Sequence, residues 1–230
     1  QKPSSAASDV YKRQAGQLAK RTNAPIFISQ IEHDIALNAL EMSDENYGDM
    51  IASAYLNYGL PEEIIERNRE VGNYFKKLVG PLPNMQIINA GQTIKTIAGE
   101  WTVRLDAGHS PAHLGLFDEE RKLYLAVDFL LGRISPNISV SLREPDSDVL
   151  VQYYDYLSGL EWLTPEWLII CGHDWHYFDG ARRARQLITH HNHRLEQLVN
   201  IDEPQTTADA ITTLFPVSYT HLRAHETLSY

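Results

Sequence analysis

Cysteine is nearly absent from this 230-residue chain, which contains Cys171 alone. One cysteine cannot form a disulfide within the chain, so the sequence argues against a disulfide-stabilised scaffold and favours a reducing compartment, with the cytoplasm as the expectation. The sequence also lacks any hydrophobic run of the ~18 residues that a membrane span needs, so no membrane partner is expected. The first eight residues are polar and lack the apolar segment of a signal peptide.

Basic residues are fewer than acidic ones, with 20 Lys and Arg against 30 Asp and Glu and a formal net charge of -10. Nucleic-acid binding depends on clustered positive side chains that contact phosphates, so this balance argues against nucleic acid as a partner. The hydrophobic share of 43% is ordinary for a folded domain with a core. We therefore expect one domain with a small appendage and a small-molecule substrate, and leave the oligomeric state open.

Hydrophobic patterns predict helices and strands between the two ends of the chain. A helix is expected to end near Arg21, and further helices are expected over residues 31–40, 44–58, 61–79, 146–160 and 180–199. Strands are expected over residues 25–29, 93–97, 101–105, 114–117, 122–127 and 167–171. Because hairpin-like runs of strands have helices between them, the sequence predicts an α+β fold in which helices cover sheets.

Three side chains that can bind metal each follow the end of a predicted strand. Gly108-His109 follows residues 101–105, Asp128 follows 122–127, and Gly172-His173 follows 167–171. Two imidazoles and a carboxylate suit zinc, with iron or manganese as alternatives. Each signal alone has a structural alternative, because a Gly-His pair in a loop is more often structural and an aspartate after a strand often makes a turn or caps a helix. The coincidence of the three favours a metal site.

The order of these residues resembles the motifs of metallo-β-lactamase superfamily hydrolases, in the branch similar to hydroxyacylglutathione hydrolases. Residues 106–113 (DAGHSPAH) resemble the GHSPxH motif, and residues 125–128 (LAVD) resemble the xxGD motif, with Val127 at the glycine position. Residues 171–173 (CGH) resemble the last ligand motif, usually PGHG, with Asp174 at the position of its final glycine. Residues 133–140 resemble a loop of one branch of the superfamily, and the likeness covers nearly all of 15–216.

The resemblance implies a metallo-β-lactamase αββα sandwich, incomplete at the N-terminus, with two zinc ions in the intact parent. His109 would bind the first metal and His173 the second, while Asp128 would bridge them and a metal-bridging hydroxide would be the nucleophile. His113, Ser135 and Asn137 are expected to support the ligands or to bind substrate. The implied activity is hydrolysis of thioesters or related esters. The alternatives are a ribonuclease of the same fold and a non-catalytic binding protein that has lost its metals.

The first metal motif of that superfamily, HxHxDH, is missing from this sequence. In the family it precedes a segment like residues 15–21, and residues 1–14 occupy its place. Residues 1–14 and 217–230 both resemble translated sequencing-adapter read-through, with native disordered tails as the alternative. His221 and His225 should then carry no function. Because ligands are missing, we expect the chain as written to bind metal weakly and to be impaired as an enzyme.

The expected organisation follows from these segments. Residues 1–14 and 217–230 are non-native tails, and residues 15–200 form a metallo-β-lactamase domain that lacks its N-terminal strands and first metal motif. Residues 201–216 resemble the start of a winged-helix appendage, with a terminal helix packed on the core as the alternative.

Two polar clusters in the predicted helix 180–199 have a plain surface interpretation. His190, His191 and His193 point in different directions on a helix, where true neighbours are three or four residues apart. Arg182, Arg183 and Arg185 are expected to form a solvated basic face, with binding of an anionic substrate or of RNA as the alternative. We therefore expect both clusters to lie on the solvated surface of this helix, and the histidines not to form a metal site.

Overall fold

The structure is a computed structural model that describes residues 16, 18–79, 82–141, 144–201 and 206–214. The expected tails over 1–14 and 217–230, with His221 and His225, lie outside the described residues. Residues 18–22 are helical, in line with the helix expected to end near Arg21.

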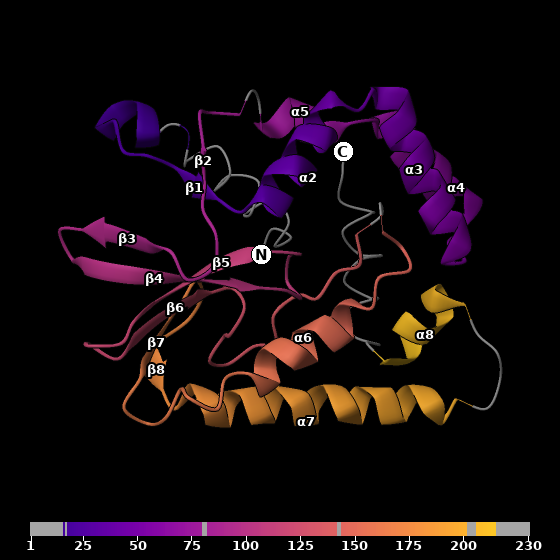
Figure 1. Cartoon of the computed structure of the whole chain (residues 1–230). Coiled ribbons are helices and arrows are strands. Elements are labelled where there is room, and N and C mark those ends of the chain that lie inside the picture. The colour runs from indigo at the N-terminus through magenta and orange to yellow at the C-terminus, as the bar shows by residue number, and fades with distance from the viewer. Residues whose placement is uncertain (1–15, 17, 80–81, 142–143, 202–205, 215–230) are drawn as a thin grey trace.

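Six strands form the larger sheet, in the order β3-β4-β5-β6-β7-β8 (Figure 1). These strands are β3 (Thr93–Thr96), β4 (Gly99–Asp106), β5 (His113–Asp118), β6 (Leu123–Val127), β7 (Leu168–Cys171) and β8 (Tyr177–Phe178). Neighbours are antiparallel except β6 and β7, which are parallel. Because β4, β6 and β7 therefore run in the same direction, their carboxyl ends meet at one edge of the sheet.

A second, smaller sheet pairs β1 (Phe27–Ile28) in parallel with β2 (Gln86–Ile87). The sequence did not predict β2 or β8. Each has two residues, which is too short for an alternating pattern to be recognised.

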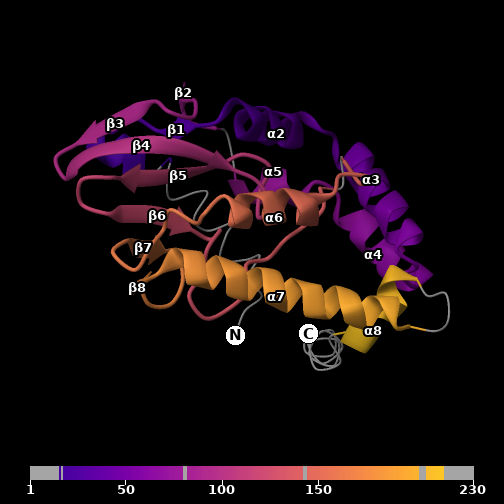
Figure 2. The same ribbon diagram turned by 60° about the horizontal axis from the view of Figure 1, so that its bottom comes forward.

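Helices lie on both sides of the larger sheet (Figures 1 and 2). α6 (Val149–Ser158) and α7 (Gly180–Val199) pack side by side on one side, and α2 (Gln30–Glu41) lies with the β1–β2 pair on the other. The other helices are α3 (Asp44–Asn57), α4 (Glu62–Val71), α5 (Tyr74–Val79) and α8 (Thr207–Leu214). The arrangement confirms the prediction of an α+β fold with helices covering sheets.

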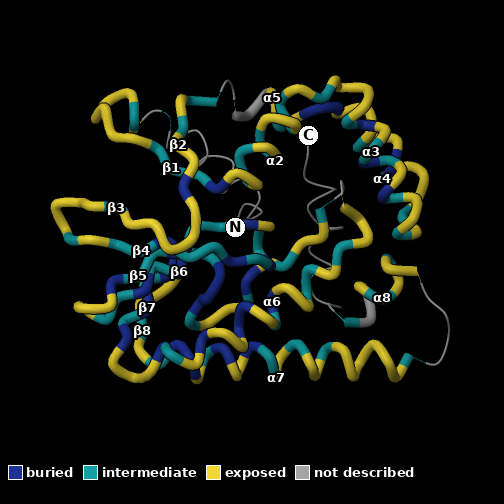
Figure 3. The backbone as a smooth tube through the Cα atoms, in the orientation of Figure 1, coloured by how far each residue is buried: buried dark blue, intermediate teal, exposed yellow. Residues whose placement is uncertain are grey.

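The main core lies between β6 and β7 of the sheet and the helices α6 and α7. Tyr124 and Ile169 point from the strands into this core, where they meet Tyr153 of α6 and Leu187 of α7. The buried residues of α7 all lie in its first half, and Figure 3 shows its second half as mostly exposed. The strands β6 and β7 thus pack against a rigid, close-packed layer formed with α6 and α7.

The expectation of one helix over residues 61–79 is wrong, because the chain breaks between α4 and α5. Gly72 ends α4 with a φ of 63°, and Asn73 is completely buried. The side-chain amide of Asn73 donates to Ala39 O at 2.8 Å and to Met42 O at 2.9 Å. A buried asparagine must satisfy its polar groups, and these bonds to preceding residues override the apolar stripe that suggested a continuous helix.

α8 lies beside the far end of α7 and the end of α3. Ala208 N donates to Tyr58 O at 3.0 Å, and Arg194 of α7 donates to Leu214 O at 2.8 Å. The assignment of residues 201–216 to a winged-helix appendage stays a prediction. Every helix in the described part of the chain is too short or too polar to cross a lipid bilayer.

Candidate metal centre

His109, Asp128 and His173 come together at the edge where β4, β6 and β7 end. Asp128 lies between the two histidines, with Oδ2 at 3.9 Å from His109 Nε2 and Oδ1 at 3.6 Å from His173 Nε2. All three side chains are partly exposed, at 31%, 30% and 49% in chain order. The structure therefore brings the predicted ligands together in a site that a small molecule can reach.

The ring of His109 is held in a defined orientation. Its Nδ1 lies 2.7 Å from the main-chain oxygen of Asn137. A carbonyl oxygen can only accept, so Nδ1 carries the proton and donates, and Nε2 presents its lone pair toward Asp128. Metal-binding histidines are oriented in this way, by a second hydrogen bond that fixes the tautomer.

The donor atoms fit zinc in their chemistry and spacing. Two ligands that each lie about 2 Å from a shared zinc ion stand roughly 3–4 Å apart. The separations of 3.9 and 3.6 Å on either side of Asp128 agree with that range. In the described part of the chain, however, no group of three or more His, Cys, Asp or Glu side chains could hold a metal ion together. The donors thus form two pairs that share Asp128, and each pair is incomplete by itself.

Val127 and Asp174, at the two positions where the resembling motifs have glycine, both have a left-handed backbone. Val127 has a φ of 46° and Asp174 a φ of 64°. Aspartate tolerates this region, but a β-branched side chain there is strained. Val127 also lies at a shift in the β6–β7 register, immediately before Asp128. Valine at position 127 therefore has a cost in stability next to Asp128.

Replacing Val127 by glycine is expected to stabilise the chain by about 1 kcal/mol. Relief of left-handed strain, at about 1–3 kcal/mol, should exceed the greater chain entropy of glycine, at about 0.5–1 kcal/mol. Asp174→Gly is the control, because aspartate accepts a positive φ, and its effect should be near zero. Urea unfolding measures both free energies, and an equal or larger gain from Asp174→Gly would contradict this explanation.

His113 lies behind His109, against the buried ring of Phe129. The rings of His113 and Phe129 stack with centroids 4.6 Å apart, and His109 contacts the same phenyl ring edge-on at 5.8 Å. Burial, with a smaller contribution from His109, lowers the pKa of His113 to about 4, so this ring is neutral at pH 7. Its Nε2 is buried and has no hydrogen-bond partner among the described residues.

Ser135 and Asn137, the other two predicted site residues, belong to the segment that follows Phe129. Asn137 meets His109 through its main-chain oxygen, while its side chain donates to Ser139 Oγ at 2.8 Å. Ser135 is half-buried in the same segment. Asn137 therefore orients the predicted ligand His109 through its backbone, which a sequence motif does not reveal.

A buried carboxylate, Asp106, holds the end of β4 before the loop that carries His109. Asp106 is 4% exposed and accepts hydrogen bonds from Arg104 Nε at 2.5 Å and from Tyr124 OH at 3.0 Å. Burial raises the pKa of Asp106, and the Arg104 guanidinium opposes that shift. These bonds connect the start of the site loop to the main core.

Arg183 holds the segment that follows Phe129, and the prediction that it belongs to a solvated basic face is wrong. Its side chain is half-buried and donates to Leu131 O at 2.7 Å and to Ile134 O at 3.0 Å. These bonds attach the segment that carries Asn137 to α7. The sequence does indicate that Arg183 is partly buried, because position 183 is four residues before the buried Leu187 and so lies beside the apolar face of α7.

Arg183→Ala is expected to cost about 2 kcal/mol of unfolding free energy, because it leaves two carbonyl groups without a charged donor. Arg185→Ala is the matched control. Arg185 pairs with Glu161 at 2.6 Å, but both side chains are more than half exposed, so its loss should cost less than about 1 kcal/mol. Chemical denaturation of the two variants measures the difference, and equal losses would show that Arg183 has no anchoring role.

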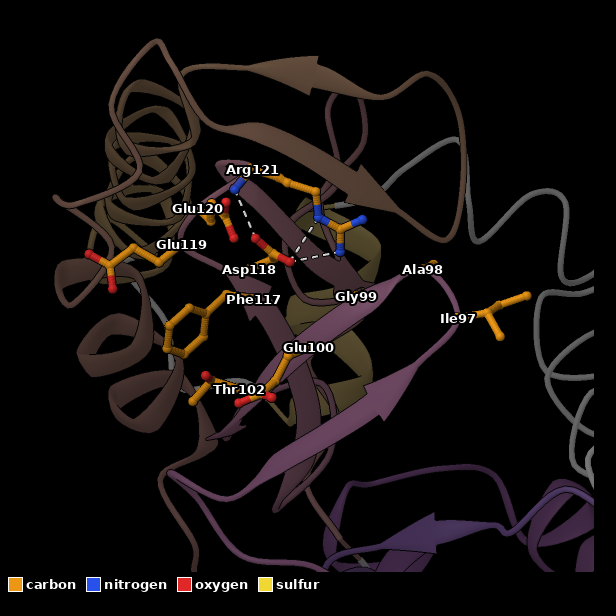
Figure 4. A pocket seen from close by; sticks show the side chains of 10 residues that line it. All are labelled: Ile97, Ala98, Gly99, Glu100, Thr102, Phe117, Asp118, Glu119, Glu120 and Arg121. Atoms are coloured by element: carbon orange, nitrogen blue, oxygen red, sulfur yellow. Dashed lines mark hydrogen bonds and ion pairs between the residues drawn. The ribbon is translucent and has the colours of Figure 1, made fainter.

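A hollow of about 510 Å³ lies at the opposite end of the strands (Figure 4). The turn between β3 and β4 and the turn between β5 and β6 line it. Its one arginine, Arg121, is already engaged by Asp118 at 2.7 Å and lies over the Trp101 ring. This hollow is remote from the strand ends that carry the histidines, so we do not assign the chemistry to it.

Comparison with known proteins identifies the fold. No protein-family model matches the sequence, and a search of curated proteins finds no match. Among solved structures, a β-lactamase domain protein from Burkholderia ambifaria is 25% identical with a TM-score of 0.69, covering 84% of this chain and 54% of its own. A metallo-β-lactamase family protein from Thermus thermophilus is 28% identical with a TM-score of 0.68, covering 84% of this chain and 61% of its own.

This chain thus spans little more than half the length of these two structures. Its sheet, its flanking helices and the strand ends that carry the predicted ligands all lie within the described residues. The protein has the metallo-β-lactamase fold, and its structural neighbours are proteins of the metallo-β-lactamase superfamily.

Proposed function

We propose that this chain carries part of the centre of a metal-dependent hydrolase, with His109, Asp128 and His173 as metal ligands and thioesters or related esters as substrates. The orientation of His109 is the observation that supports the proposal most. Because Nδ1 donates to Asn137 O, the unprotonated Nε2 faces the Asp128 carboxylate at 3.9 Å. Two electron-rich atoms that face each other in this way gain stability from a cation between them.

Zinc suits this donor set, and when bound it would lower the pKa of a coordinated water to about 7 and polarise a substrate carbonyl. The residues of the chain have the supporting tasks. Asp128 lies near both histidines, and Asn137 keeps His109 in one tautomer. The ring of Phe129 packs against the His109 ring. Cys171 is no candidate nucleophile, because it is buried, its thiol donates to Trp175 O at 3.3 Å, and burial raises its pKa.

We further propose that the chain binds zinc weakly and hydrolyses slowly. Catalytic zinc sites usually have three protein ligands per ion. The residues that the structure describes offer two for each, His109 with Asp128 and His173 with Asp128. The same shortage favours a second candidate, a binding protein without catalysis. The ribonuclease alternative stays a sequence-based expectation, against which the net charge of -10 argues.

Hydrolysis assays test the proposal. The full chain is stripped of metal, reloaded with zinc, and supplied with a generic thioester or a generic phosphodiester. We expect slow thioester hydrolysis that depends on zinc and is lost in Asp128→Asn, which keeps the side-chain shape but removes the charge. Glu161→Gln, at the exposed surface pair with Arg185, is the matched control and should hydrolyse like the wild type.

Each alternative predicts a different outcome. Cleavage of the phosphodiester alone would replace the esterase assignment by the ribonuclease. Zinc binding without hydrolysis of either substrate would favour the binding protein. Two tightly bound metal ions per chain would overturn the proposal that the centre is incomplete.

A further inference from the structure

The first turn of α2 holds the loop between His109 and His113. Ser29 Oγ donates to Ala112 O at 2.7 Å, and Glu32 Oε1 accepts from Ala112 N at 2.9 Å. Ser29 and Glu32 are 83 and 80 residues from Ala112 in sequence. Both main-chain polar groups of one site-loop residue are therefore satisfied by the start of one distant helix.

Glu32 makes this contact instead of the bond that its position predicts. Ser29-Gln30-Ile31-Glu32 has the S-x-x-E spacing of a capping box, in which the glutamate usually bonds back to the main-chain N–H of the capping serine. Ser29 does cap α2, since its hydroxyl accepts from Glu32 N at 3.3 Å. The Glu32 carboxylate accepts from Ala112 N, so this side chain links α2 to the loop that carries His109.

The bond from Ser29 to Ala112 is buried, and the bond from Ala112 to Glu32 is partly buried. Ser29 is 1% exposed and Ala112 is 4% exposed. A partly buried hydrogen bond to a charged acceptor is stronger than a neutral one at the surface, and the loss of either bond leaves a polar group of the buried Ala112 unsatisfied. The contact is therefore strong enough to fix the position of Ala112.

The loop itself needs such an anchor. It starts with Gly108, whose φ of 132° is a conformation that other residues rarely adopt, and it carries His109. Ala112 is its last residue before β5. Fixing Ala112 from α2 restricts the path of the chain from Gly108 onward, and so restricts the backbone of His109.

We propose that Ser29 and Glu32 are positioning residues of the metal centre, acting on His109 and His113 through the main chain of Ala112. The role of these residues in metal binding rests on the proposed function. Their role in holding the loop rests on the two bonds to Ala112.

Amide hydrogen exchange and zinc titration of the full chain test this proposal. In Glu32→Ala, the exchange rate of the Ala112 amide should rise about tenfold to a hundredfold, because its charged acceptor is lost. The imidazole NMR signals of His109 in the metal-free chain should shift, and zinc affinity should fall about tenfold, as for other residues that support metal ligands. Glu32→Gln retains an acceptor oxygen and should restore most of the exchange protection and zinc affinity.

Ser43→Ala is the matched control for a loss of helix capping. Ser43 caps α3 through the same kind of bond, accepting from Asn46 N at 3.1 Å. This variant should lose less stability than Ser29→Ala, which also leaves Ala112 O without its donor. It should leave Ala112 exchange and the His109 signals unchanged, whereas Ser29→Ala should change both. A merely structural role for α2 predicts that the two serine variants behave alike.

The results separate this inference from the proposed function. Unchanged Ala112 exchange and unchanged His109 signals in Glu32→Ala would overturn the proposal that Ser29 and Glu32 hold the site loop. Changed signals with wild-type zinc affinity would overturn its role in the metal centre. If the wild-type chain binds no zinc, the proposed function and the metal role both fail, while exchange and the His109 signals still decide whether Glu32 holds the loop.

Discussion

Gly172→Ala is expected to weaken zinc binding by about a hundredfold while leaving stability nearly unchanged. A Cβ atom at position 172 would press directly against Asp128 Oδ1. That oxygen is the end of a flexible side chain, so the carboxylate would move and the backbone would remain. It is also the atom that lies 3.6 Å from His173 Nε2. The substitution therefore displaces a proposed ligand without removing any donor atom.

Gly159→Ala is the control for this substitution. A Cβ at position 159 would meet its nearest neighbour, Arg104 Nη2, at 3.3 Å, and Gly159 lies at the end of α6, outside the site. Zinc affinity, measured by competition with a chromophoric chelator, should be the same in Gly159→Ala and the wild type. Equal zinc affinity in Gly172→Ala would mean that Asp128 does not contact the metal.

Gly108→Ala is expected to destabilise the chain by about 3 kcal/mol or more, which is the largest loss of stability expected from any of these substitutions. Gly108 has a φ of 132°, and a Cβ there would lie 2.6 Å from Tyr153 Cδ2 and 2.8 Å from Tyr153 Cβ. Tyr153 cannot retreat easily, because it is fully buried and its hydroxyl donates to Phe129 O at 2.9 Å. The substitution therefore combines backbone strain with overpacking of the core.

Gly91→Ala separates these two causes. Gly91 also has a positive φ, 80°, but nothing lies within 4 Å of a Cβ at that position. Its cost should be about 1 kcal/mol, from backbone strain alone. Denaturant unfolding gives both values, and a similar loss in the two variants would show that the contact with Tyr153 contributes nothing.

Elements with strong local signals were predicted closely from the sequence. The last long helix begins and ends at Gly180 and Val199, as predicted, because Asp179 caps its first turn and buried residues recur along one face. The strands β6 and β7 lie within one residue of their expected ends at every terminus. Local apolar patterns and caps are sufficient for such elements, since the chain over a few turns carries the whole signal.

Features that depend on distant partners were not predicted. The break at Gly72 and Asn73 exists because Asn73 bonds to Ala39 and Met42, more than 30 residues away. The bonds of Arg183 to Leu131 and Ile134 cross about 50 residues. A hydrophobic pattern carries no information about such partners.

The candidate site illustrates both cases. The strand-end positions of His109, Asp128 and His173 were visible in the sequence, and the structure brings these side chains together. Their role as ligands stays a prediction. The support from Asn137 O and from Glu32 was not visible, since one acts through its backbone and the other across 80 residues.

Equilibrium zinc titration of the full chain and its single-alanine variants tests the central claim most directly. We predict that His109→Ala and His173→Ala each weaken zinc binding at least about tenfold, and that Asp128→Ala weakens it further because Asp128 serves both histidines. His190→Ala, at an exposed histidine of α7, should bind zinc like the wild type. Wild-type zinc affinity in Asp128→Ala, or a loss confined to His190→Ala, would contradict the account.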